Sequence, residues 1–168
     1  MKSIESANEP YFNELEQYSR RNNIRIESIE DSEQENYTET SETLIEALNS
    51  HIPDLNLAKS DIDISHRLGP FQPQKERPII IKLVSRMRRN QIMKAAKILR
   101  SKPKPVYVND HLMKTHAEVF ACVRKKQSDI VKSSSTREGT IVYRDINDQT
   151  HKVNAEQYRF WLDLPWPK

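Results

Sequence analysis

Glycine is nearly absent from this chain, which has two glycines, Gly69 and Gly139, in 168 residues. Phosphate-binding P-loops and dinucleotide-binding turns need several glycines at fixed spacing, because the backbone must approach the phosphates closely. The sequence therefore excludes both kinds of nucleotide site.

Cysteine and long apolar runs are also scarce. Cys122 is the single cysteine, so no internal disulfide can form, which is typical of a reducing compartment. No apolar run approaches the roughly 20 residues of a membrane-spanning helix, and the first ten residues lack the apolar segment of a signal peptide. We expect an intracellular protein, cytoplasmic or nuclear or both, that makes no membrane contact.

Charge is abundant and unevenly distributed. The net charge is +3, but residues 1–63 carry 5 Lys or Arg against 15 Asp or Glu, whereas residues 64–132 carry 17 against 4. Residues 133–168 are balanced, with 5 of each sign. A segment as basic as 64–132 indicates a polyanionic partner, and nucleic acid is the commonest one.

Hydrophobic periodicity predicts an α+β protein whose first part alternates strands and helices. After a helix that ends near residue 22, the predicted order is a strand over 23–29, a helix over 40–52, strands over 61–68 and 79–84, a helix over 86–100 and a strand over 106–108. This β-α-β-β-α-β order is typical of ferredoxin-like domains and RNA-recognition motifs (RRMs).

A smaller unit is predicted to follow. A helix over 110–132, broken by Ser133 to Ser135, precedes a β-hairpin over 140–143 and 151–153 and a last helix over 155–162. We therefore expect three parts: an N-terminal helix over 1–22, which could be the remnant of a coiled coil, an RRM-like domain over 23–109, and a C-terminal helix and hairpin domain over 110–168.

Pleat alternation predicts which residues of the first sheet point away from the core. Alternate isoleucines mark the core side of strands 23–29 and 79–84, and we expect His66 to share the apolar side of strand 61–68. The predicted open face presents Arg25, Ser65, Arg67, Lys82 and Tyr107. Because Tyr107 is its one aromatic ring, we expect phosphate contacts to dominate over base stacking.

Further basic side chains are predicted on the surfaces of the helices. Those expected to support phosphate binding are Arg86, Arg88, Arg89, Lys94, Lys97, Arg124, Lys125 and Lys126. Lysines and arginines on helices often do no more than face water, and for Lys94 and Lys97 both interpretations stay open.

Catalytic and metal chemistry find little support. Asp61 and Asp63 could hold a magnesium ion on one side of a strand, but alternating acids on an exposed strand are usually only solvated. His111 and His116 do not share a helix face, and no cysteine lies at ligand spacing from them. We expect a non-catalytic protein that has no metal and no cofactor.

Four segments, taken in order, resemble the nucleic-acid-binding protein encoded by the first open reading frame of LINE-type retrotransposons, and the C-terminal part is also similar to the baculovirus few-polyhedra (FP) protein. The segments are residues 20–26 (RRNNIRI), 64–69 (ISHRLG), 77–83 (RPIIIKL) and 136–141 (TREGTI). The chain departs from the LINE family at the nearly absent coiled coil and at Ser134 and Ser135, where an aromatic residue is expected.

The resemblance implies a nucleic-acid chaperone of a retrotransposon ribonucleoprotein, in which an atypical RRM and a C-terminal domain hold single-stranded RNA in a basic cleft. By motif position, Arg25, Arg67, Arg77 and Lys82 would line one wall and Arg137 the other, with Tyr143 nearby. It also implies a homo-oligomer formed through the N-terminal helix. We predict sequence-independent binding of single-stranded RNA or DNA; the alternative is a viral or domesticated module of the FP type that binds protein.

Overall fold

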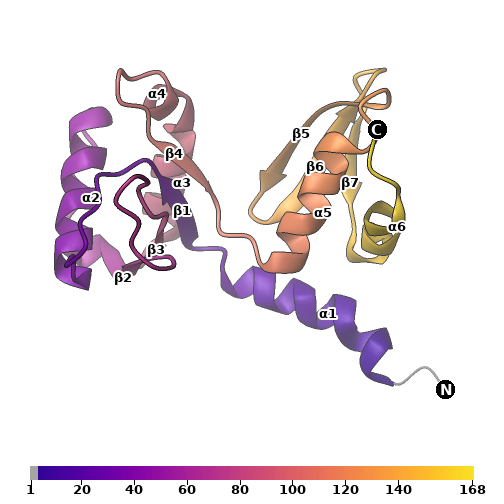
Figure 1. Cartoon of the computed structure of the whole chain (residues 1–168), viewed down its shortest axis with the longest axis horizontal. Helices are drawn as coiled ribbons and strands as arrows, with labels where there is room; N and C mark the ends of the chain where they lie inside the picture. Colours follow the sequence, from indigo (N-terminus) through magenta and orange to yellow (C-terminus); the bar gives the residue numbers. More distant parts are fainter. Residues whose placement is uncertain (1–3) are drawn as a thin grey trace. The chain divides into compact units, whose positions relative to one another are not determined.

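The structure is a computed structural model that describes residues 4–168, with side chains from residue 12 onward (Figure 1). The chain forms two compact units. One comprises residues 22–111, and the other combines the N-terminal segment up to residue 21 with residues 112–168. The N-terminal helix α1, Ile4–Ser19, thus belongs to the same unit as the C-terminal part of the chain.

The 22–111 unit is a four-stranded antiparallel sheet with helices packed on it. Its strands lie in the order β2-β3-β1-β4, which places β1 and β3 at the centre. The elements along the chain are β1 (Asn23–Glu27), α2 (Tyr37–His51), η1 (Lys59–Asp61), β2 (Ile62–Arg67), β3 (Ile79–Leu83), α3 (Arg86–Lys94), α4 (Ala96–Arg100) and β4 (Tyr107–Asp110).

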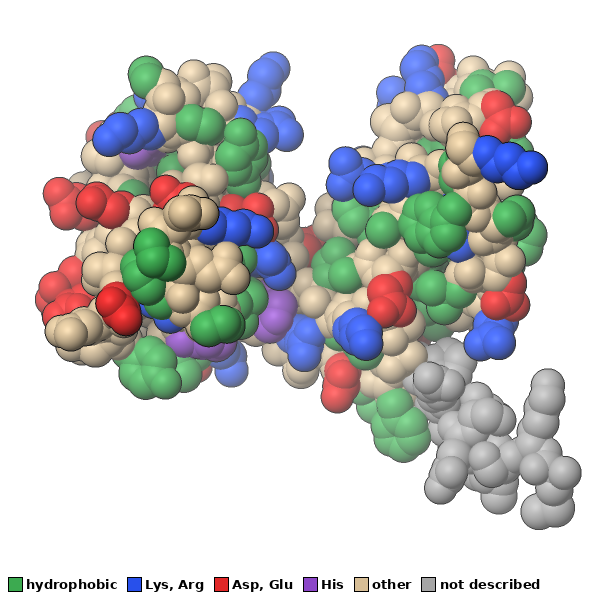
Figure 2. Space-filling view, viewed as in Figure 1, with side chains coloured by type: hydrophobic (Ala, Val, Ile, Leu, Met, Phe, Trp, Pro, Cys, Tyr) green, Lys and Arg blue, Asp and Glu red, His purple; other side chains and the backbone are tan. Residues whose placement is uncertain are grey.

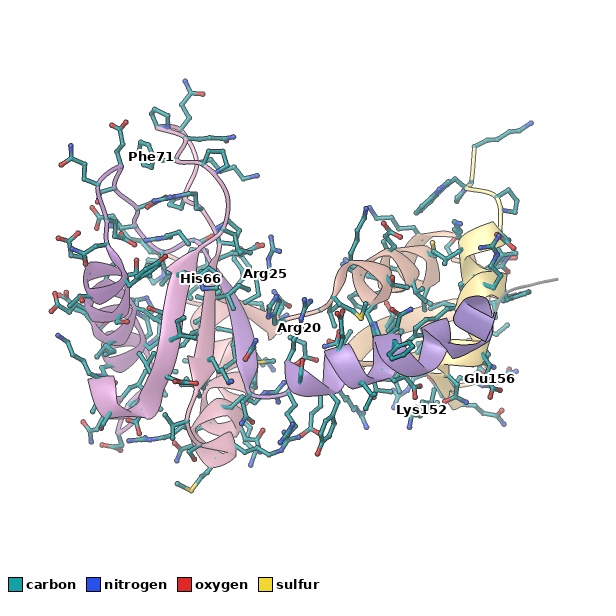
Figure 3. All side chains as sticks on the ribbon, turned by 90° about the horizontal axis from the view of Figure 1, so that it is seen from below. Arg20, Arg25, His66, Phe71, Lys152 and Glu156 are labelled. Atoms are coloured by element: carbon teal, nitrogen blue, oxygen red, sulfur yellow. The ribbon has the colours of Figure 1, made fainter. Side chains whose placement is uncertain are left out.

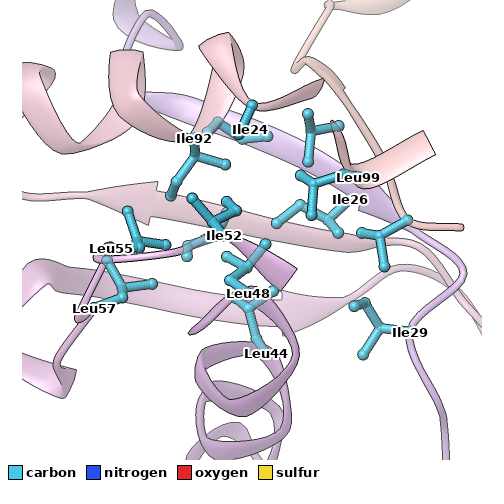
Figure 4. Close-up of a cluster of buried hydrophobic side chains, with 14 of the residues drawn as sticks. Ile24, Ile26, Ile29, Leu44, Leu48, Ile52, Leu55, Leu57, Ile92 and Leu99 are labelled. Carbon is cyan, nitrogen blue, oxygen red and sulfur yellow. The ribbon is translucent and has the colours of Figure 1, made fainter. Parts of the chain in front are cut away.

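The core of this unit lies between the sheet and its helices (Figure 4). Ile24 and Ile26 of β1 are fully buried there, together with Leu48 of α2, Ile92 of α3 and Leu99 of α4. Burial of each such side chain contributes roughly 1.5–3 kcal/mol. The alternation predicted for β1 and β3 is confirmed, since Ile79, Ile81 and Leu83 of β3 join the same core.

Helix boundaries in this unit differ from the predicted ones. Helix α2 begins three residues earlier than predicted, because Asn36 and Glu39 form a reciprocal capping box at its start. The predicted helix over 86–100 is two helices, which meet at Ala95, where the backbone leaves helical geometry with ψ at 2°.

A β-bulge in β2 reverses the predicted facing of that strand. Ile62 pairs with Leu83 and Ile64 pairs with Lys82, so Asp63 is an extra residue without an opposite number on β3. An inserted residue shifts the side-chain alternation by one position. Beyond the bulge, Ile64 is 51% exposed whereas Ser65 is 2% exposed.

The second unit is a three-stranded antiparallel sheet, in the order β5-β6-β7, covered on one side by helices. Besides α1 it contains α5 (Lys114–Lys125), β5 (Val131–Arg137), β6 (Thr140–Asp145), β7 (Thr150–Val153), η2 (Ala155–Gln157) and α6 (Tyr158–Asp163). Val119 and Val123 of α5 pack with Ile141 and Val153 of the sheet and Trp161 of α6.

Two predictions for this unit were wrong. The helix expected over 110–132 covers only α5, because Asp110 ends β4 and the chain leaves helical geometry after Lys126. Ser133 to Ser135, expected to break a helix, lie inside β5 and pair with residues 142–144 of β6. The expected hairpin is confirmed as β6 and β7, and β5 adds a third strand to it.

Helix α1 is attached to this unit through Gln17, which is 6% exposed. Its side-chain oxygen accepts a hydrogen bond of 2.9 Å from the backbone N–H of Met113. The same side chain fills the space beside Gly139, where an added Cβ would lie 2.6 Å from the Gln17 Cγ. Leu15 and Tyr18, two large apolar side chains of α1, are exposed, and the side chain of Tyr11 lies outside the described ones. Oligomerisation through this helix stays a prediction.

Candidate nucleic-acid interface

The open face of the four-stranded sheet is the side that none of the helices within the 22–111 unit covers. The strand register defines its residues, since directly paired residues share a face. Arg25 of β1 pairs with Ile80 and Asn109, and Ile80 in turn pairs with His66. We call this surface the open face, and its residues are Asn23, Arg25, Glu27, Ile64, His66, Ile80, Lys82, Tyr107 and Asn109.

Three of the predicted site residues lie on the open face: Arg25, Lys82 and Tyr107. Figure 3 shows Arg25 and His66 projecting from the strands of this sheet. A cavity of about 350 Å³ adjoins the face, lined by Arg25 and by the loop over 68–78, including Gln72 and Lys75. The sheet thus brings cationic, amide and aromatic groups from three strands onto one surface.

Carboxylates offset the two cations of the open face. The Nε of Arg25 lies 3.0 Å from Glu27, and the Nζ of Lys82 lies 3.6 Å from Asp63. All four side chains are more than 40% exposed, so each pair contributes about 0–1 kcal/mol and can exchange for a ligand phosphate. In the space-filling view this unit shows acidic and basic side chains intermixed (Figure 2).

Arg67 does not lie on the open face, contrary to the prediction, because the bulge turns it toward the helices. Its side chain is 3% exposed and its Nε lies 2.8 Å from Glu35 and 3.4 Å from Asp31. Its guanidinium also donates to the backbone carbonyls of Ile29, Glu30 and Arg77. This arginine attaches the acidic loop before α2 to the sheet.

Arg77 belongs to the same buried ion cluster, which we define as Asp31, Glu35, Arg67 and Arg77. It binds Asp31 in bidentate fashion, with Nε and Nη2 at 2.9 and 3.0 Å from the two carboxylate oxygens. Hydrogen bonding from Arg77 is the main reason why the pKa of Asp31 is lowered from 3.8, and it raises the pKa of Arg77. Two arginines of the predicted cleft wall are therefore bound within the fold.

Ser65 and His66 exchange their predicted places for the same reason. Ser65 is buried and its hydroxyl lies 2.7 Å from that of Ser41 on α2, whereas His66 takes the position on the open face. Asn23 and Asn109 also lie on this face. Their alternation with Ile24 and Val108 could have identified them from the sequence, but the bulge that exposes His66 has no comparable signal.

The basic residues of α3 differ in their exposure. Arg89 is 5% exposed and pairs with the buried Asp110 of β4. The prediction that Arg89 is available to a phosphate ligand is therefore wrong. Arg88 donates to the backbone carbonyl of Leu55 and lies 3.4 Å from Asp61. Arg86 is half-buried at the start of α3, while Lys94 and Lys97 are exposed on the helices.

The basic residues at the end of α5 also differ in their exposure. Lys125 is exposed, as predicted, and Arg124 lies over the ring of Phe120 with its Cζ 5.5 Å from the centroid. Lys126 is buried instead. Its Nζ donates to the carbonyls of Trp161 and Leu162 at the end of α6, at 3.1 and 2.9 Å.

Arg137 and Tyr143 lie on opposite faces of the three-stranded sheet. Arg137 is exposed at the end of β5 and pairs with Thr140. Tyr143, three positions after Thr140 on β6, faces the helices. Its ring is stacked on His151 at 4.8 Å between centroids and lies edge-on to Trp161 at 5.6 Å. The structure does not bring these two predicted site residues together.

Within residues 12–168, no group of three or more acidic, histidine or cysteine side chains is arranged to hold a metal ion. His116 is buried on α5, and burial, with a smaller contribution from Arg20, lowers its pKa from 6.5 to about 4. None of the described helices has the length and apolar character needed to span a membrane.

No protein-family model matches the chain, and no curated protein matches it.

Proposed function

We propose that this chain binds single-stranded nucleic acid, RNA above all, without catalysis and largely without regard to sequence. The open face supports this proposal most strongly. The helices of the 22–111 unit do not cover this side of the sheet, and it presents Arg25, Lys82 and Tyr107 together. The two cations would contact phosphates, and Tyr107, 39% exposed, offers a platform for a base.

The order of strands and helices supports a finer assignment of the 22–111 unit, which we propose to be an atypical RRM of the ferredoxin-like fold. A sheet in the order β2-β3-β1-β4 with two helical segments on one face is the arrangement of that fold. The resemblance of four segments to the LINE-type protein agrees with this assignment, and chaperone activity in a retrotransposon-like ribonucleoprotein would follow from it.

Binding should be tested by fluorescence anisotropy with a mixed-sequence single-stranded RNA at several salt concentrations. Loss of two phosphate contacts in Arg25→Ala/Lys82→Ala is expected to reduce the slope of log K against log salt by roughly 1.4. The matched control is Lys132→Ala/Arg159→Ala, which removes the same charge from two exposed ion pairs, with Asp148 and Asp163, in the other unit. If both double variants behave alike, the open face is not the binding surface.

One observation favours protein binding of the FP type as a second candidate. The cations of the open face are already offset by Glu27 and Asp63, and Ile64 is 51% exposed beside Lys82. Such a compensated, partly apolar surface also suits a protein partner. A partner that remains bound after nuclease treatment and is lost on Ile64→Asp would favour this candidate.

A further inference from the structure

A groove of about 830 Å³ lies within the 22–111 unit, between α2 and the segment that leads from α4 into β4. Its apolar floor includes Ile29 and Val106, each 3% exposed. One wall is a face of α2 that is distinct from the face bearing the core residues Leu44 and Leu48. We call this cavity the α2 groove; it is lined by residues 28–30, by residues 43, 46, 47, 50 and 51 of α2, by residue 76 and by residues 103–106.

The α2 groove carries negative charge, although the chain as a whole has a net charge of +3. Glu46 on α2, Glu30 after β1 and Glu76 before β3 line it, and all three side chains are exposed. In the part of the chain with described side chains, no nitrogen of a lysine, arginine or histidine lies within 4 Å of these three carboxylates. Among the described residues of the lining, Lys104 is the only lysine or arginine.

Several other polar groups of the α2 groove are also hydrogen-bond acceptors. The Nδ1 of His51 lies 2.7 Å from the backbone carbonyl of Ala47, which can only accept, so Nδ1 carries the proton and Nε2 of the neutral ring is an acceptor. On the opposite wall, Pro103 and Pro105 have no backbone N–H, and the N–H of Val106 is already bonded within the fold. Lysine and arginine side chains have donors only, so they match this lining in charge and in hydrogen bonding.

We propose that the α2 groove binds a short, extended peptide segment of a partner protein that carries lysine or arginine next to an apolar residue. The carboxylates would contact the cationic side chains, and the floor at Ile29 and Val106 would contact the apolar one. The face of α2 over residues 43–51 is about 12 Å long, which matches roughly three to four residues of an extended chain. Because its charge repels phosphates, this groove does not depend on the proposed nucleic-acid binding.

The test selects peptides from a random phage-displayed library on the full chain, with counter-selection on Glu30→Lys/Glu46→Lys. Both positions are exposed, and lysine is as good a helix former as glutamate, so we expect an unchanged Tm. The selected peptides should be enriched in lysine and arginine. A fluorescein-labelled copy of one of them should bind the variant at least roughly tenfold more weakly than the parent in anisotropy titrations, because two attractive charges become repulsive.

The matched control is Glu33→Lys/Glu42→Lys, which makes the same change of charge at two exposed positions of the same unit outside the groove. It should bind the peptide with nearly the affinity of the parent. If it loses as much affinity as the groove variant, the effect is one of overall charge and the proposal is refuted. In NMR spectra of the parent, the methyl groups of Ile29 and Val106 should shift when the peptide is added; shifts confined to another surface would also refute it.

Further outcomes distinguish the peptide from other occupants. Peptides that depend on the groove but lack lysine and arginine would overturn the proposal, as would a selection that yields no peptide able to distinguish the parent from the groove variant. Displacement of the peptide by an equal concentration of spermidine would assign the groove to a small polyamine instead. Self-association of the parent that is lost in the groove variant would assign it to a second copy of the chain. Failure of the parent to bind RNA would refute the proposed function alone.

Discussion

Replacement of Arg67 by alanine tests whether this arginine serves the fold or a ligand. In the structure its side chain is 3% exposed and faces two carboxylates, Asp31 and Glu35, that are also nearly inaccessible. Removing one partner of a buried ion pair costs about 3–5 kcal/mol, because it leaves an uncompensated charge. Asp31 keeps Arg77, and Glu35 keeps the hydroxyl of Thr40, so we expect the lower end, about 3 kcal/mol.

A loss of this size is easily measured. In a unit of about 90 residues, 1 kcal/mol corresponds to roughly 4–8 °C in Tm, so Arg67→Ala should lower Tm by roughly 12 °C or more. Both tryptophans, Trp161 and Trp166, lie in the other unit, so their fluorescence serves as an internal control. Calorimetry and hydrogen exchange of the β3 amides report on the unit that contains Arg67.

The control is Arg25→Ala, which breaks an ion pair whose side chains are 42% and 43% exposed and should cost less than 1 kcal/mol. The combination Arg67→Met/Glu35→Gln should recover part of the stability, because it removes charge without leaving any unpaired. If Arg67→Ala has the same Tm as Arg25→Ala but loses affinity for RNA, Arg67 contacts the ligand, and the buried ion cluster does not stabilise the fold.

Two further predictions concern the C-terminal unit. Gly139→Ala should destabilise this unit by about 1–3 kcal/mol, because φ at Gly139 is +83° and the new Cβ would collide with Gln17. Unfolding monitored by tryptophan fluorescence measures this loss. Unchanged stability would show that α1 does not dock at this turn. In the folded chain the pKa of His116 is lowered from 6.5 to about 4. Between pH 6.5 and pH 4 the unfolded state therefore binds more protons than the folded state. The free energy of unfolding should fall by at most about 3 kcal/mol as the pH decreases across this range. His116→Leu should remove that slope; a slope that persists would assign it to another group.

The parts of the fold that could be predicted from the sequence are those where one local signal dominates. The isoleucines of β1 alternate with polar residues and Lys82 interrupts the apolar run of β3, and these signals placed Arg25 and Lys82 on the open face correctly. Helix α5 was predicted too long because its hydrophobic pattern continues through Ile130 and Val131, which lie in the turn before β5 and at its start. The serines of β5 form a strand through pairing with β6, which no local propensity predicts.

The errors at the candidate site have a common physical origin, which is pairing over long sequence distances. The bulge at Asp63 depends on how β2 aligns with β3, and it moves Arg67 from one side of the sheet to the other. The partners of Arg67 and Arg77 lie more than 30 residues away in the acidic loop, so the basic and acidic segments of the chain partly neutralise each other. A charge count along the sequence cannot separate cations used in this way from cations that remain available.

In the last 36 residues the numbers of acidic and basic side chains are equal, so the charge count alone gives no sign of the cations that the family resemblance placed there, such as Arg137. Folding partly separates these charges: four of the five acids lie in turns and helices and Asp145 ends β6, while Arg137, Arg144 and Lys152 share one side of a sheet. Net charge is a sum over positions, whereas a phosphate responds to the few charges within about 10 Å of it. The most basic segment of the chain therefore contributes many of its arginines to the fold, and a count of charges along the chain does not identify the cations that stay exposed, such as Arg137 and Arg144.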